Sequence, residues 1–295
     1  MCPDFKISMI PVTAQVNRVA ERGQPSVIPD LLPLRLLLAF GSGWLVVATV
    51  TSVADAYGAN RAGFAGGLPS TGAVSLLIIG APQSQNAAIQ ATTLLPLAFS
   101  ITFAFLLFYA IPKQMRFGQR MLVAFILWFL ASMLVVVLAP DNFTSSLAGS
   151  VAVSSIVFFL HKRIGIEDAP RVSIGFGVGR MIWRGALGGC VVAGVVTISA
   201  LSGPLVAGVF AGAPAIWSSS LYVSSRAHGV KFSRSLTKSF MQTGILTIIP
   251  FSVAARYFFS AVGIWWGTFF AYLVISPVAW LAWKLTEARE KPGSK

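Results

Sequence analysis

Acidic residues are scarce in this chain. Nine Asp and Glu stand against 22 Lys and Arg, and no acid lies between residues 56 and 140 or between residues 169 and 286. Asp55 is the acid nearest to a predicted membrane segment. Cation carriers and proton-driven exporters usually place a carboxylate inside the membrane, so this scarcity argues against both classes.

Cysteine and histidine are scarcer still. Cys2 and Cys190 are the two cysteines, and His161 and His228 the two histidines. We expect no disulfide, because Cys190 lies in an apolar segment and Cys2 near the chain end. The spacing predicts no metal site and no cofactor. The sequence also lacks a nucleotide-binding loop, a catalytic-triad pattern and a zinc-binding helix, so we do not expect an enzyme.

Charge of either sign is rare, whereas apolar residues dominate. Mean hydropathy is +0.78, 56% of residues are hydrophobic, and 11% are charged, against about 25% charged in a soluble domain. This composition predicts an integral membrane protein whose main partner is the lipid bilayer. The net charge of +13 has a simple source in the basic cytoplasmic loops of membrane proteins, and we expect no nucleic-acid partner.

The long apolar runs predict an all-α polytopic membrane protein with about nine transmembrane helices, because lipid forces backbone groups to pair within each segment. The predicted spans are roughly 34–53, 62–81, 88–111, 121–139, 144–160, 181–201, 204–224, 236–258 and 265–284. Before them, Val12 to Arg22 fits either a surface amphipathic helix or a loose tail.

An internal duplication organises the chain. Without gaps, residues 35–76 match residues 180–221 at 13 of 42 positions, against about one in twelve expected by chance. Because five spans separate equivalent helices, the two copies should be inverted. The predicted domains are a polar tail (1–33), repeat 1 (34–139), a connector helix and loop (140–179), repeat 2 (180–284) and a basic tail (285–295).

Basic residues support the inversion independently. The loop after the third helix holds Lys113, Arg116 and Arg120 in repeat 1, and its counterpart in repeat 2 has no cation. The loop after the second helix shows the reverse, with Arg226 and Lys231 in repeat 2 only. The positive-inside rule then predicts an outside N-terminus and a cytoplasmic C-terminus.

Residues 180–284 resemble the GlpM-like family of small four-helix inner-membrane proteins. The resemblance rests on Ala213-Pro214, on Ser225-Arg226-Ala227-His228-Gly229, and on Thr247-Ile248-Ile249-Pro250 followed by Tyr257-Phe258. Repeat 1 keeps Leu68-Pro69 of this pattern. The resemblance implies a multi-pass protein of the bacterial inner membrane, here as a fused, inverted pair of such units.

Two proline-containing segments of small residues are the first candidate site. Proline suits an early helical position, and a helix that starts inside the membrane directs its positive end at a buried group. Close helix packing explains the same residues equally well. The candidates in these segments are Gly66, Gly67, Pro69, Ser70, Thr71, Ser75, Gly212, Pro214, Ser218, Ser219 and Ser220.

A second group of candidates lies on the third helix of each repeat and among the membrane cations. Thr92 and Thr237 occupy equivalent positions. Lys238 either reaches inward or snorkels to the interface. Arg184 and Arg256 lie within predicted spans, where ionisable residues are functional candidates.

These features together predict a transporter or lipid translocator with a midplane route between the repeats, for an anionic or phosphate-bearing ligand. The alternative is a membrane scaffold or accessory subunit of an envelope-polysaccharide system. The oligomeric state stays open.

Overall fold

The computed structural model describes residues 32–57, 68–112, 114–138, 142–166 and 177–289, and every regular element in these ranges is a helix. The segment Val12 to Arg22, for which a surface helix and a loose tail were both open, lies outside them, as do Gly66 and Gly67. The helices are α2 (Leu32–Tyr57), α4 (Ser70–Gln83), α5 (Gln85–Ala91), α6 (Leu95–Ala110), α7 (Phe117–Val137), α8 (Phe143–Arg163), α9 (Val178–Ser202), α10 (Pro204–Phe210) and α11 (Ala215–Arg289).

Several of these helices have the length and apolarity of membrane spans. Five of them qualify in the described part of the chain, or six when α5 and α6, bent by 45° at their junction, count as one span. The outward side chains of α7 are large and apolar, for example Leu122 at 61% exposure and Leu130 at 57%. The chain is therefore a multi-pass membrane protein.

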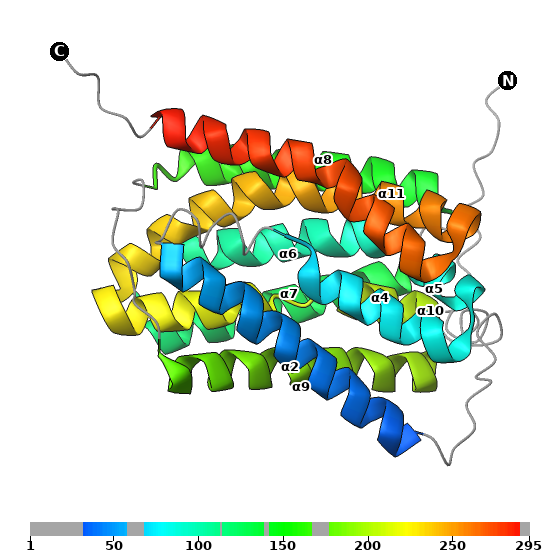
Figure 1. Cartoon of the computed structure of the whole chain (residues 1–295). Helices are drawn as coiled ribbons and strands as arrows, with labels where there is room; N and C mark the ends of the chain where they lie inside the picture. Colours follow the sequence, from blue (N-terminus) through cyan, green and yellow to red (C-terminus); the bar gives the residue numbers. More distant parts are fainter. Residues whose placement is uncertain (1–31, 58–67, 113, 139–141, 167–176, 290–295) are drawn as a thin grey trace, which may run out of the picture.

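Helix α11 consists of three consecutive helical pieces. Its 75 residues would measure about 110 Å as one straight helix, against about 30 Å for a bilayer core. Gly229 and Gly263 interrupt it with φ of 84° and 81°, a region that glycine enters without steric cost. In Figure 1, the yellow, orange and red pieces of α11 run in alternating directions, so the chain reverses at both glycines.

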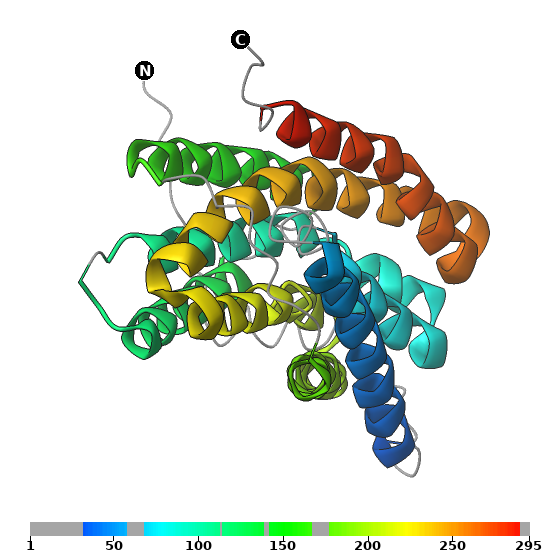
Figure 2. The ribbon, with the colours of Figure 1, turned by 60° about the vertical axis from the view of Figure 1, so that its left-hand side comes forward.

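Helix α6 lies at the centre of the bundle. It is apolar on all sides, as expected of a helix surrounded by protein, and nearly all of its residues are buried. Helices α7, α8 and α11 pack around it, and Figure 2 shows it enclosed by the others.

Helices α2 and α9 cross at two glycines in equivalent positions of the duplication. A methyl group placed on Gly43 would lie 2.9 Å from the Gly188 carbonyl oxygen, and one on Gly188 would lie 3.0 Å from the Gly43 carbonyl oxygen. The Gly43 face also meets Val192, and the Gly188 face meets Val47. In Figure 1, α2 runs from right to left and α9 from left to right.

The same exchange of partners recurs one turn away. Gly185 packs against the Trp44 side chain, and Gly189 packs against Phe40. Phe40 and Gly185 are equivalent positions, as are Trp44 and Gly189. Each large residue of one helix therefore fills the space that a glycine leaves on the other.

Candidate functional site

Two helices begin inside the bundle, each directly after a proline. Pro69 precedes α4, and Pro214 precedes α11. The helix starts expected at both prolines are present. Helix α10 ends at Phe210, so the apolar segment around Pro214 is interrupted rather than continuous.

The two starts share one backbone hydrogen-bond pattern. The Ser70 N–H donates to the Leu68 carbonyl at 2.8 Å, and the Ala215 N–H donates to the Ala213 carbonyl at 2.8 Å. One turn later, Ala73 donates to Pro69 and Ser218 donates to Pro214, both at 2.8 Å. Each donor and acceptor of the first start has its counterpart 145 positions later.

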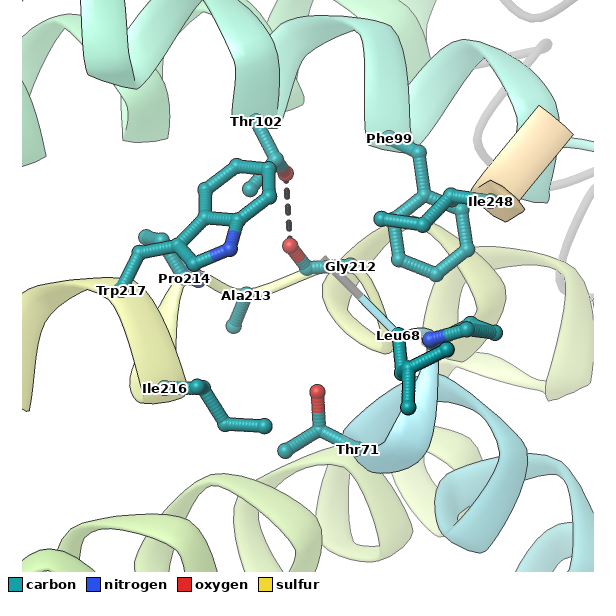
Figure 3. A pocket seen from close by; sticks show the side chains of 11 residues that line it. Leu68, Thr71, Phe99, Thr102, Gly212, Ala213, Pro214, Ile216, Trp217 and Ile248 are labelled. Carbon is teal, nitrogen blue, oxygen red and sulfur yellow. Dashed lines mark hydrogen bonds between the residues drawn. The ribbon is translucent and has the colours of Figure 1, made fainter. Parts of the chain in front are cut away.

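A small cavity lies where the two starts meet (Figure 3). Its volume is about 20 Å³, roughly the space of one water molecule. The lining comes from α4, α6, α11 and the two segments before the helix starts: Leu68, Pro69, Thr71, Phe99, Thr102, Gly212, Ala213, Pro214, Ile216, Trp217 and Ile248. The positive ends of α4 and α11 therefore lie at a mostly apolar cavity.

The interrupted backbone on one wall of the cavity is held by a chain of hydrogen bonds. The Thr102 hydroxyl donates to the Gly212 carbonyl at 2.6 Å, the dashed bond in Figure 3. The Trp128 indole N–H donates to the Thr102 oxygen at 3.2 Å. A carbonyl left by a helix break in an apolar interior needs such a partner, and Thr102 supplies it from α6.

Two close contacts beside the cavity join equivalent pairs of positions. A methyl group on Gly72 would lie 2.6 Å from the Phe99 ring, and one on Gly244 would lie 3.3 Å from the Trp217 ring. Gly72 and Trp217 are equivalent positions, as are Phe99 and Gly244. The two predicted repeats thus share this contact with the large and small residues exchanged.

The structure brings together only part of the predicted site. Pro69, Thr71, Gly212 and Pro214 line the cavity, whereas the candidate serines do not. Ser218 and Ser219 donate to carbonyls three residues earlier in their own helix. Ser70, Ser75 and Ser220 are buried, and the hydroxyls of Ser70 and Ser75 have no hydrogen-bond partner among the described residues.

The predicted membrane cations lie elsewhere, and two of them bind backbone carbonyls of other helices. Arg256 donates to the Ile89 carbonyl at 3.0 Å and to the hydroxyls of Thr92 and Thr93 at 3.2 and 3.0 Å. Arg184 is 2% exposed and donates to the Thr51 carbonyl at 3.3 Å.

Lys238, the third of these cations, is half-buried on α11. It does not line the cavity, and neither Arg184 nor Arg256 does. The cavity therefore gathers four of the predicted site residues, and the predicted cations lie away from it.

Phe99, Thr102 and Trp217 are among the lining residues that the sequence analysis did not name as site candidates, together with Leu68, Ala213, Ile216 and Ile248. A signal for Thr102 was present, because its equivalent Thr247 is also threonine. Trp217 gave a weaker signal as the one aromatic residue in the stretch of mostly small residues from Pro214 to Ser220. The side chains that reach the cavity from α6 depend on helix rotation, which apolar composition on all sides does not specify.

Within the described ranges, no group of three His, Cys, Asp or Glu side chains is placed to hold a metal ion. Comparison with protein-family models, with curated proteins and with solved structures finds no match for this chain. The resemblance to the GlpM-like family therefore stays a prediction.

Proposed function

We propose that this protein is a transporter or lipid translocator whose route passes between two inverted repeats at the cavity near Pro69 and Pro214. The observation that carries the proposal is the meeting of two helix starts at one buried cavity, the second of them at an interruption between α10 and α11. An interruption in an apolar interior leaves backbone groups that need partners, and membrane proteins tolerate it where it lines a site or route.

The inverted repeats are supported by the reciprocal contacts of α2 and α9. When position i of one helix touches position j of the other and j touches i, the two are related by a two-fold axis. The contacts of Gly43 with Val192 and of Gly188 with Val47 have this form. When α5 is counted with α6, and α10 with the first of the three pieces of α11, the described helices fit nine crossings.

The proposed topology is supported by the grouping of the basic loops. Arg120 donates to the Tyr109 carbonyl at 3.3 Å, and Arg234 donates to the Ala110 carbonyl at 3.1 Å. Cations favour the negative end of a helix, here the C-terminal end of α6. Two loops that the positive-inside rule assigns to the cytoplasm thus meet at one end of the bundle, in the proposed bacterial inner membrane.

An anionic or phosphate-bearing substrate suits the charges near the cavity. The positive ends of α4 and α11 lie there, and the sequence has no acid between residues 169 and 286 to offset them. Helix ends of this kind favour negative groups. Because Arg184 and Arg256 are engaged with backbone carbonyls, the helix ends rather than these side chains carry the attraction.

The second candidate is a membrane scaffold or accessory subunit, and the size of the cavity favours it. A cavity of about 20 Å³ is far below the 300–1,000 Å³ or so of small-molecule sites. Transport therefore requires a second, more open conformation. A scaffold requires none.

Thermal unfolding of the full-length protein in lipid nanodiscs separates the two candidates. The probes are inorganic phosphate, glycerol phosphate, and nanodiscs containing phosphatidic acid, against ethidium and tetraphenylphosphonium as cations. A ligand at 100 times its Kd stabilises the folded state by about 2.7 kcal/mol. We expect an anionic probe to raise the Tm, and the phosphatidic acid result separates a lipid from a soluble phosphate.

Thr71→Val tests whether that binding occurs at the cavity. Loss of one hydrogen bond should weaken binding by about 1 kcal/mol, whereas Thr268→Val, which removes a bond within α11, should not. No stabilisation by any probe supports the scaffold. Stabilisation by cations alone contradicts the anionic substrate.

A further inference from the structure

Two equivalent threonines are each held by a basic side chain from another segment. The Thr92 hydroxyl donates to the Ile89 carbonyl at 2.6 Å, and the Thr237 hydroxyl donates to the Arg234 carbonyl at 2.7 Å. Both threonines are fully buried. Arg256 reaches Thr92, as described above, whereas the His161 Nε2 lies 3.0 Å from the Thr237 oxygen.

These two contacts lie near opposite ends of α6. Thr92 precedes the first residue of α6, which is Leu95. At the other end, the Tyr109 hydroxyl bonds the Ser233 hydroxyl, one turn of α11 before Thr237. Helix α6 has 16 residues, so its ends are about 24 Å apart. The cavity lining takes Phe99 and Thr102 from its middle.

The partners of the two threonines differ in their chemistry. An arginine guanidinium stays charged at all physiological pH values, whereas an imidazole changes its charge near neutral pH. Because the Thr237 hydroxyl donates its one hydrogen to Arg234, the His161 Nε2 must carry the hydrogen of their contact. The hydrogen bond between His161 and Thr237 therefore forms when the imidazole ring is neutral.

Among the described residues, the charged groups named here around His161 are basic. Lys238 on α11 is close enough to repel a positive ring, and Arg234 lies one turn from Thr237. Lys162 and Arg163 follow on α8 itself and are exposed. Tyr109 is the tyrosine of α6 in this region. The sequences of α6, α8 and α11 up to residue 286 contain no acidic residue. His161 is 5% exposed, so a positive ring there is both buried and repelled.

We propose that the His161–Thr237 contact is a proton-operated latch between α8 and α11, and that His161 is its proton-binding residue. A hydronium ion of the solvent gives its proton to the Nδ1 lone pair and leaves as water, the ring becomes positive, and the α8 end separates from Lys238 and Thr237. The Arg256–Thr92 contact stays closed, because its charge does not change. Coupling of this latch to substrate movement rests on the proposed function, whereas the latch itself does not.

Hydrogen–deuterium exchange of the full-length protein in nanodiscs tests the latch without any substrate. Exchange is compared at pH 7.5 and pH 5.0 after correction for the intrinsic rate. Peptides covering residues 230–241 should exchange about threefold faster or more at pH 5.0, because local opening exposes their amides. Peptides covering residues 85–93, which belong to the Arg256 contact, serve as the internal control and should not change.

Three variants complete the experiment. His161→Gln keeps a neutral donor and should remove the pH response. Thr237→Val removes the hydroxyl and should exchange fast at both pH values, whereas Thr237→Ser should behave like the parent. An unchanged rate in residues 230–241 at pH 5.0, or an equal pH response in His161→Gln, overturns the latch. A latch that opens in a protein that binds no anion would instead overturn only the proposed function.

Discussion

Gly43 and Gly188 hold equivalent positions in the two halves of the chain and face each other at the crossing of α2 and α9. A Cβ atom placed on Gly43 would lie 2.9 Å from the Gly188 carbonyl oxygen, and one placed on Gly188 would lie 3.0 Å from the Gly43 carbonyl oxygen. No side chain fits between the helices at this point. Small residues commonly allow such close approach in membranes, and here the approach lies at the proposed two-fold axis.

Substitution of either glycine should therefore destabilise the protein. Gly43→Ala and Gly188→Ala each place a methyl group against backbone and valine atoms of the other helix. Overpacking of this kind costs about 1–3 kcal/mol. Thermal unfolding in detergent micelles should show a lower Tm for both variants, of similar size because the contacts are reciprocal.

Gly41 is the matched control for that prediction. It lies on the same helix, and nothing lies within 4 Å of a Cβ placed on it. Gly41→Ala should leave the Tm unchanged or raise it, because alanine is the better helix former by about 1 kcal/mol. Equal losses in Gly41→Ala and Gly43→Ala would contradict a close crossing at Gly43.

The contact between Gly72 and Phe99 should appear as a coupling energy. Gly72→Ala alone presses a methyl group into the Phe99 ring, which lies 2.6 Å from that point. Phe99→Leu removes the ring and makes room. We expect the double variant to lose less free energy of unfolding than the sum of the single variants, by about 0.5–3 kcal/mol. If the losses of unfolding free energy in the single variants simply add in the double variant, the two residues are not in contact.

Thr102→Val should destabilise the helix break at Gly212. The substitution keeps the side-chain volume but leaves the Gly212 carbonyl and the Trp128 indole N–H without their partner. Each buried group left unpaired costs about 1–3 kcal/mol. Thr197→Val, which breaks only a bond to its own helix at Ala193, is the control and should cost clearly less in the same unfolding measurement.

The presence of several long apolar helices and the two helix starts after proline followed from the sequence, whereas the bend between α5 and α6 within the predicted span 88–111 did not. Apolar length predicted the spans, and proline at the start of a segment predicted helix starts that the structure places at Ser70 and Ala215. The loop expected after the second helix of repeat 2 is instead the single kink at Gly229. A glycine at positive φ can turn a chain without other loop residues, so apolar length alone overestimated the length of that connection.

The partners of the charged side chains did not follow from the sequence. Arg256 binds the Ile89 carbonyl in the last turn of α5, and Arg184 binds a carbonyl of α2. In a sequence, a cation within a membrane span is a candidate for binding a ligand. Its contacts with other helices become known only from the structure. The acceptors of Arg256 lie at the bend between α5 and α6, and that bend depends on tertiary packing rather than on local composition.

Cysteine labelling in intact cells tests the inverted architecture most directly. Single cysteines are placed at the exposed positions Asn86, Gln114, Ala227 and Ala261, in a background without Cys2 and Cys190, and treated with a membrane-impermeant maleimide. Inverted repeats predict labelling at Asn86 and Ala261 from outside, and labelling at Gln114 and Ala227 only after lysis. Labelling of Asn86 and Ala227 from the same side would contradict the inversion and, with it, the route between the repeats.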